Sequence, residues 1–383
     1  MSKRSLTIKG KRVVYILLCL GSITISFNVA AMSAVIPAIS ADLNLPDFVV
    51  AKIISYYLIP YGIGALLYAP LTRYFSYRFI LAASIGLYAL ACYAGASIIT
   101  LDQLQLALIY MGIAAAGNIP LALMIIGDFF DKSIRGRLVG LFFSCSFFAS
   151  LAGIMLSGIA HWRMLFFVPS VFGAVLALAI LVLGRPLLNK THRGTINYWK
   201  VLHNVNVRKI FAFIFIISFC YHGVHKWYGV YLNREYGMNQ LSISFFFMLS
   251  AMGGLVGQLF GGVVSDLRGR MATCHIGVLG LSISVILLAG HYPQFILGMV
   301  LLLISMFWTV GHNGVSTALT DFSDHDRPVI ASLNSAVRFF SGGLGFYASS
   351  FLVEKSFSLT FLIIGIIILL LNFSVDRVIP VQS

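Results

Sequence analysis

The segment Arg185–Lys209, RPLLNKTHRGTINYWKVLHNVNVRK, separates two long apolar regions of this chain. It is the longest polar break in the sequence, and it holds six Lys or Arg residues and no acidic residue. Six apolar stretches precede it and six follow it, and each has about the 20 residues that cross a hydrocarbon core roughly 30 Å thick. The break predicts two helical halves, residues 1–184 and 210–383, joined by a linker at 185–209.

The composition of the whole chain is that of an integral membrane protein. Of its 383 residues, 59% are hydrophobic and 10% are charged, whereas a soluble domain carries about 25% charged residues. Such a chain cannot cover a water-facing surface, and its hydrophobicity excludes disorder. The formal charge of +14 comes with too few polar residues to form a nucleic-acid groove, so we expect no nucleic-acid partner.

Apolar runs between charged residues or Pro and Gly breaks predict an all-α membrane protein with twelve transmembrane helices. The run after the basic N-terminus is too long for the core of a signal peptide, so we expect it to remain as the first helix. The predicted ranges are 13–38, 48–71, 77–99, 102–127, 136–160, 164–184, 209–232, 240–264, 271–290, 293–317, 329–353 and 357–375.

The basic residues predict the orientation of these helices. With the N-terminus in the cytoplasm, 20 of the 26 Lys and Arg residues fall in inner loops, three in outer loops and three within spans. Basic loops are retained on the cytoplasmic side of a membrane. We therefore predict a multi-pass protein of the inner (plasma) membrane with both termini in the cytoplasm.

A chain of six plus six helices is typical of transporters built from repeated halves, whose substrate site lies between the halves near the membrane midplane. The linker residues Tyr198, Trp199, Val201 and Leu202 predict a short amphipathic segment held against anionic headgroups. All five cysteines fall within spans and form no CxxC pair, so we interpret them as small buried apolar residues.

A motif lies between the predicted helices 240–264 and 271–290: Gly262-Val-Val-Ser-Asp266-Leu-Arg-Gly269-Arg270. It matches the G-x-x-x-D-x-x-G-R loop of the major facilitator superfamily (MFS), and the chain resembles bacterial drug and metabolite efflux branches of that superfamily. The resemblance implies the MFS fold, with twelve helices in two six-helix bundles, and a gating role for Gly262, Asp266, Gly269 and Arg270. We expect Gly262 to permit close helix approach and Gly269 to permit a tight turn.

The equivalent loop of the first half departs from the motif. Ala69, Arg73 and Ser76 stand where the family has Gly, Asp and Gly. We assign Arg73 and Arg78 to the gating loop, with Arg73 pairing differently from the family's Asp.

Three further departures weaken a proton-driven multidrug antiporter as the interpretation. Asn28 stands where several drug–proton exporters carry an acid, and Leu108 precedes Gly112 where an Arg is expected. The Gly-Pro pair expected in the predicted helix 136–160 reads Gly153-Ile154.

Polar residues inside the predicted spans are the candidate substrate or coupling residues, because ionisable groups are costly in a bilayer. No acidic residue lies deep within a span. In the resembled fold the first, fourth, seventh and tenth helices line the central cavity, and each carries a polar feature here. The candidates are Asn28, Asn118, His222, His225, Lys226, His312 and Asn313, together with Arg338 in the range 329–353.

The sharpest of these predictions is His222, His225 and Lys226, whose i, i+3, i+4 spacing puts them on one helix face. A cationic face beside aromatic residues suits an anionic or hydrogen-bonding organic solute. In the alternative interpretation, the Lys226 side chain extends to the outer membrane–water interface, and the histidines form hydrogen bonds with neighbouring backbone or Tyr groups. Arg338 has a structural alternative in bonds to carbonyl groups or to Asn334. His312 is a candidate proton carrier, and the alternative is a hydrogen-bonded histidine of the core.

These patterns favour a secondary active transporter that works by alternating access and exports an anionic or neutral amphipathic compound. One alternative is a proton-coupled multidrug antiporter that uses histidines, and another is a transporter-fold receptor or assembly component without flux. The sequence holds no P-loop, metal-ligand cluster or nucleophile triad, so we expect neither an enzyme nor a cofactor. The expected partners are a small-molecule substrate, protons as a coupling ion and membrane lipids, and the expected state is a monomer.

Overall fold

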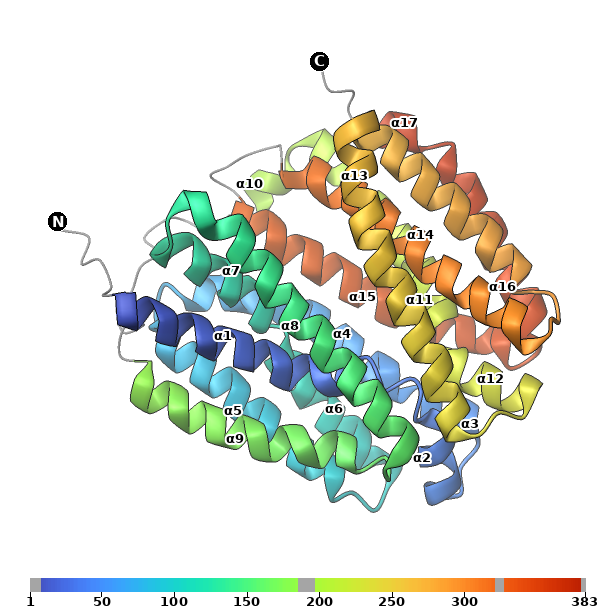
Figure 1. The fold of residues 1–383 in the computed structure, drawn as a ribbon, viewed down its shortest axis with the longest axis horizontal. Helices are drawn as coiled ribbons and strands as arrows, with labels where there is room; N and C mark the ends of the chain where they lie inside the picture. The colour runs from blue at the N-terminus through green and yellow to red at the C-terminus, as the bar shows by residue number, and fades with distance from the viewer. Residues whose placement is uncertain (1–7, 185–196, 321–326, 380–383) are drawn as a thin grey trace.

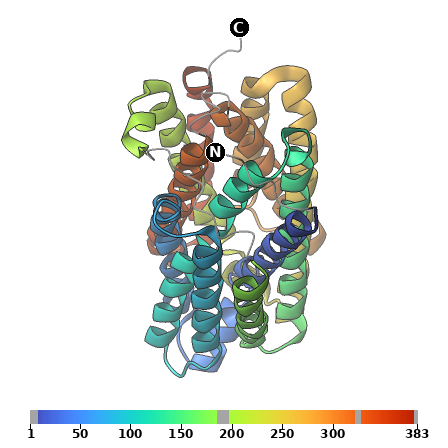
Figure 2. The same cartoon turned by 90° about the vertical axis from the view of Figure 1, so that its left-hand side faces the viewer.

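The computed structural model describes residues 8–184, 197–320 and 327–379, and within them it contains α-helices and no β-strand. The long helices run side by side (Figure 1 and Figure 2). The helices from α1 to α9 form one group, coloured blue to green, and those from α11 to α16 form a second, coloured yellow to red (Figure 1). This is the predicted all-α fold of two bundles.

Three of the six predicted spans in the first half are interrupted, namely 13–38, 48–71 and 102–127. The helix expected over 13–38 ends at Val29, and a new helix begins at Ile36, because Pro37 lacks the N–H that a continuous helix would need. Pro120 similarly lies in the first turn after a break at Ala116 and Gly117. The helices are α1 (Ile8–Val29), α2 (Ile36–Leu43), α3 (Asp47–Ala51), α4 (Ile53–Leu71), α5 (Tyr77–Ala96), α6 (Leu101–Ala115), α7 (Asn118–Phe129), α8 (Lys132–Ile159) and α9 (Met164–Leu183).

In the second half the span expected over 209–232 is interrupted after His225, and two other predicted spans lie within one long element. That element changes direction at Gly269, whose φ of 80° and ψ of 171° are available to glycine alone among ordinary residues. The helices are α10 (Tyr198–Leu202), α11 (Val205–His225), α12 (Tyr228–Tyr236), α13 (Gln240–Leu287), α14 (Gln294–Thr320), α15 (Arg327–Val353), α16 (Phe357–Asn372) and α17 (Val375–Val378).

The helices account for all twelve predicted crossings. Nine stretches of the described residues are long and apolar enough to cross a membrane. One of them, α13, contains the predicted spans 240–264 and 271–290, while α15 and α16 cover 329–353 and most of 357–375.

The two bundles meet along two helix pairs, α4 with α15 and α8 with α13. Glycines bring these helices close together, because a Cβ on Gly62 would lie 2.6 Å from the backbone nitrogen of Phe340. On the second pair, a Cβ on Gly158 would lie 3.0 Å from Ser244. Small residues at such contacts are how membrane helices pack without a hydrophobic driving force between them.

The linker helix α10 packs against the end of the molecule where α1 begins and α17 lies, which we call the termini end (Figure 1). The Tyr198 hydroxyl donates to the Leu66 carbonyl at 2.9 Å, and burial raises the pKa of this phenol to about 12. Val201 is buried, whereas Trp199 is 75% exposed, so two of the predicted apolar residues lie on different sides of the segment. Residues 185–196 of the predicted linker lie outside the described residues.

Candidate substrate cavity

A cavity of about 540 Å³ lies between the two bundles. Its lining extends to Leu319, near the end of α14, and to Ile330, in the first turn of α15. Both helix ends lie at the termini end of the molecule, so the cavity occupies that half of the protein.

The two bundles supply different chemistry to this cavity. From the first bundle, the lining residues are Ile119 and Leu123 of α7 and Val139 and Phe143 of α8, all of them apolar. From the second bundle, the polar lining residues are His222, Gln258, His312, Asn313, Ser316, Asn334, Ser335 and Arg338. One side of the cavity is therefore apolar and the other carries hydrogen-bonding groups and a cation.

Arg338 supplies that cation. Its guanidinium carbon lies 5.2 Å from the centroid of the Trp308 ring, as in a cation–π contact. In the described part of the chain, no carboxylate lies within ion-pair distance of this guanidinium. The side chain therefore has charge and donors available for an anion in the cavity.

A stack of rings holds Trp308 beneath Arg338. The Tyr221 ring lies parallel to Trp308 at 4.0 Å, with an angle of 1° between the planes. The His225 ring continues the stack at 5.0 Å from Tyr221. Because Tyr221 and His225 belong to α11, this helix fixes the ring on which the guanidinium rests.

Two histidines line the cavity beside this stack. His222 Nδ1 lies 3.0 Å from the Ser218 carbonyl, and since a carbonyl only accepts, Nδ1 carries a proton. His312 Nε2 lies 2.9 Å from the Ser316 hydroxyl. The neighbouring Asn313 donates from Nδ2 to the Gln258 carbonyl at 2.9 Å. These contacts fix the directions of the side chains that a solute would meet.

The structure places two other candidates inside the first bundle. Asn28 is 1% exposed, and its Oδ1 accepts from the Tyr88 hydroxyl at 2.6 Å. Asn118 is also buried, and among the described residues its Oδ1 has no hydrogen-bond partner. Neither residue lines the cavity.

The predicted cluster on α11 is divided. His222 lines the cavity, whereas His225 lies between the rings of Tyr221 and Tyr228, 5.0 and 4.9 Å away, with a buried Nδ1 that lacks a partner. Lys226 is 9% exposed and forms the C-cap of α11. Of the three, only His222 is among the lining residues, because α11 ends before Lys226 and the rings enclose His225.

In the motif Gly262–Arg270, the conformation of Gly269 agrees with the prediction, whereas the surroundings of Gly262 do not. Gly269 adopts the conformation of a tight turn. At Gly262, however, an added Cβ would meet no atom within 4 Å, and the close approach occurs at Gly261, next to Val310 and Asn313. Asp266 is exposed, and the described residues offer it no ion pair.

The end of the molecule away from the termini, which we call the opposite end, is closed between the bundles. Arg234 of α12 pairs with Asp47 of α3 at 2.9 Å and lies over the Phe48 ring at 4.2 Å. Gln240 donates to the Ala34 carbonyl at 3.1 Å, again across the bundles.

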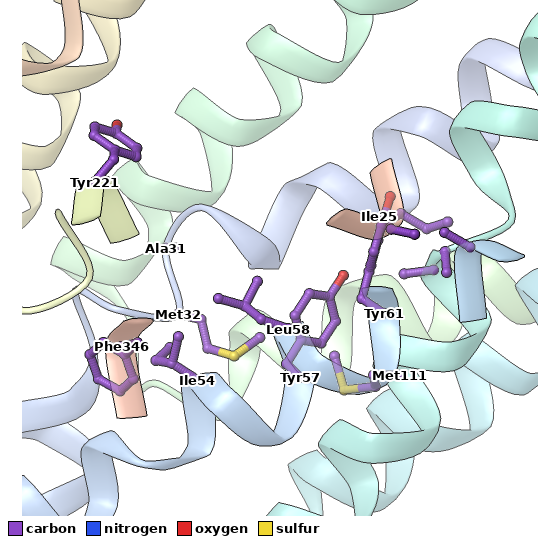
Figure 3. Close-up of a cluster of buried hydrophobic side chains, with 14 of the residues drawn as sticks. Ile25, Ala31, Met32, Ile54, Tyr57, Leu58, Tyr61, Met111, Tyr221 and Phe346 are labelled. Atoms are coloured by element: carbon purple, nitrogen blue, oxygen red, sulfur yellow. The ribbon is translucent and has the colours of Figure 1, made fainter. Parts of the chain in front are cut away.

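Below these polar contacts lies an apolar seal. Figure 3 shows Met32 beside Ile54 and Leu58, with Phe346 of α15 next to them. All four side chains are buried. The bundles are therefore in contact at this end, whereas the cavity separates them toward the termini end.

Four polar lining residues, Gln258, Ser316, Asn334 and Ser335, are not among the substrate or coupling residues predicted from the sequence. Ser316 follows His312 by four residues and Ser335 precedes Arg338 by three, so helical spacing from known candidates would have found both. Gln258 lies in a glycine-rich run of α13 and carries no comparable signal.

Two bundles of membrane-crossing helices around a cavity with one polar wall define a membrane transporter. The family model described as Major Facilitator Superfamily matches residues 18–346, and the chain belongs to that family.

Among curated proteins, the chain is 26% identical over 195 residues to the multidrug transporter TPO1_1 of Candida glabrata. It is 25% identical over 235 residues to the probable galactarate/D-glucarate transporter GudP of Bacillus subtilis. These matches cover 50% and 52% of this chain but only 34% and 50% of the two relatives.

Among solved structures, the chain is similar to a bacterial homologue of the human lysosomal transporter Spinster in its inward-facing, unoccupied conformation. The TM-score is 0.76 at 12% identity, and the match covers 98% of each chain. At this identity the likeness shows the fold alone.

Proposed function

We propose that this protein is a secondary transporter that exports a small amphipathic organic anion by alternating access. The observation that carries the proposal is Arg338, a cation in the cavity wall with no carboxylate partner among the described residues. A charge inside the bilayer is costly and is kept where it binds a solute or an ion. An anionic group on the solute supplies the missing partner.

The apolar wall from the first bundle favours a solute whose remaining part is apolar. Phe143, Leu123 and Ile119 face the polar wall across the cavity and have no hydrogen-bonding group to offer. A cavity of about 540 Å³ has the size of sites for small organic molecules. The bound solute places its anionic group at Arg338 and its apolar part against α7 and α8.

The proposed direction, export, assumes that the termini end faces the cytoplasm. The excess of basic residues in the loops on the side of the termini favours a cytoplasmic termini end. The solute then enters from the cytoplasm and leaves when the opposite end opens. Opening there separates Asp47 from Arg234 and breaks the seal around Met32.

The relatives support two solute classes. Galactarate and D-glucarate, named for GudP, are dicarboxylates and agree with an anion at Arg338. The multidrug relative, together with the apolar wall, favours a second candidate function, export of varied amphipathic drugs with histidines as proton carriers.

Flux in reconstituted liposomes tests the proposal. We would measure counterflow of an aromatic monocarboxylate, a sugar dicarboxylate and a cationic dye of similar size. We expect saturable transport of the aromatic carboxylate and none of the dye. Equal transport of the dye would favour the multidrug candidate, and no flux of any solute would favour a receptor.

A further inference from the structure

A second concave site lies on the outer face of the first bundle, away from the substrate cavity. It is a groove of about 500 Å³ between α4 and α5. Leu67, Phe79 and Leu87 line it and are exposed large apolar side chains on membrane-spanning helices. The groove therefore opens toward the acyl chains of the bilayer.

The hydroxyl groups at the floor of this groove are hydrogen-bonded to backbone carbonyls of the protein. The Tyr68 hydroxyl donates to the Ile113 carbonyl at 3.0 Å, and the Ser84 hydroxyl donates to the Ala114 carbonyl at 2.7 Å. The lining residues of α5 run from Phe79 to Leu87, which is about 12 Å of helix at 1.5 Å per residue. This length and chemistry suit part of a fatty acyl chain.

Two arginines are next to lining residues at the termini end of the groove: Arg73 lies between Leu71 and Phe75, and Arg78 precedes Phe79. Arg73 is exposed in the turn before α5, and the Arg78 guanidinium carbon lies 5.7 Å from the centroid of the Phe79 ring. Arg78 Nε is buried without a hydrogen-bond partner, and in the described part of the chain neither arginine has a carboxylate within ion-pair distance. The position that matches Arg73 in the second half holds Asp266, so the two equivalent loops carry opposite charges at this position.

We propose that the groove binds an anionic phospholipid, with an acyl chain between α4 and α5 and the phosphate at Arg73 and Arg78. Guanidinium groups bind phosphate oxygens through paired hydrogen bonds. Basic pockets between membrane helices on the cytoplasmic side hold anionic headgroups. The site is independent of Arg338 and of the transported solute.

Native mass spectrometry of the purified full chain tests this site. The probes are phosphatidylglycerol and phosphatidylethanolamine with identical acyl chains. We expect the wild type to retain phosphatidylglycerol about 25-fold more strongly, since each of the two basic residues near an anionic headgroup contributes roughly a factor of five. The double variant Arg73→Gln/Arg78→Gln lowers this preference to about 2-fold or less. The control Arg268→Gln, which removes an exposed cation from the equivalent loop of the second half, leaves the preference unchanged.

A second variant tests the groove itself. Ala83→Trp fills the space between α4 and α5 without removing either arginine, and we expect it to reduce retention of both lipids. If Arg78 is needed for folding, Arg73→Gln alone still lowers the preference, because Arg73 is exposed. The proposal is overturned if the double variant keeps the wild-type preference or if Ala83→Trp retains both lipids. It is equally overturned if Ala83→Trp converts a dimer into a monomer, because the groove is then an interface between copies.

Discussion

The first bundle contributes Ile119, Leu123, Val139 and Phe143 to the cavity, whereas the second contributes every polar side chain that lines it. In the proposed function, the two walls meet different parts of one solute. A molecule with an anionic end and an apolar end then contacts both bundles at once, and each bundle binds the part that suits its wall. The proposed division of roles between the halves would explain how a chain with few charges recognises an amphipathic solute.

The halves also differ in where their buried polar groups point. In the first, Asn28 bonds to Tyr88 within its own bundle. In the second, His222, His312 and Arg338 all reach the cavity. Among the predicted candidates, Asn28 of the first half thus bonds within its bundle, whereas His222, His312 and Arg338 of the second half line the cavity.

The largest expected effect is at the cationic wall. Arg338→Gln removes the charge that pairs with the solute, and losing one partner of a buried ion pair costs about 2–5 kcal/mol. We expect the affinity for the transported anion to fall about 100-fold. Arg338→Lys recovers part of the loss, because a point charge lacks the paired donors of a guanidinium.

Binding to purified protein and counterflow in liposomes measure this effect, with Arg268→Gln as a control outside the cavity. Wild-type affinity in Arg338→Gln would show that the polar wall does not bind the anion.

The next largest effect is a loss of stability, and we compare it between the loop that contains Gly269 and the equivalent loop that contains Ser76. Gly269→Ser forces a side chain into a backbone conformation of positive φ, and such strain costs about 1–3 kcal/mol. Ser76, in the first loop, has φ of −72° and makes no capping bond with its side chain. Ser76→Gly should cost no more than about 1 kcal/mol. Thermal unfolding of the two purified variants compares them, and equal losses would mean that the turn at Gly269 can relax.

A smaller effect is expected at the apolar wall. Phe143→Asn places an amide against the apolar part of the solute and should lower affinity for an aromatic carboxylate about 10-fold, within the range of about 1–3 kcal/mol for one hydrophobic contact. Affinity for a sugar dicarboxylate should change by less than about 2-fold, because it has no apolar part. The control Phe143→Leu keeps the wall apolar. Equal losses for both solutes would contradict the separate roles of the two walls.

The smallest effect concerns the ion pair that joins the bundles at the opposite end. The Arg234 side chain is 39% exposed, and such pairs contribute about 0–1 kcal/mol. Asp47→Asn should therefore raise the population that is open at that end by at most about 5-fold. Distances between spin labels on α3 and α12 report this population. An unchanged distribution in low salt would place the closure in the apolar seal around Met32.

Hydropathy alone predicted the spans because membrane insertion depends on the local apolar length of the chain. The interruption before α7 contains Gly117 and the turn within α13 contains Gly269, and glycine is a residue that breaks helices. The break after His225 had no such residue to mark it.

The cavity could be predicted only in part. Arg338 and His312 stand out in sequence as ionisable residues within apolar runs. The sequence could not tell Gly261 from Gly262 at the close approach, nor His222 from His225 at the cavity. Neighbouring positions on a helix differ by about 100° in direction, and the rotation of the helix is set by its partners.

The sequence by itself determined the class of protein, the twelve crossings and the basic loops, because these follow from how each segment partitions between water and lipid. Only the tertiary structure decided that the polar wall belongs to one half and that Trp308 and Tyr221 hold Arg338 in the cavity. It also decided which end of the molecule is closed. These features depend on contacts between residues far apart in the chain, and hydropathy carries no information about such contacts.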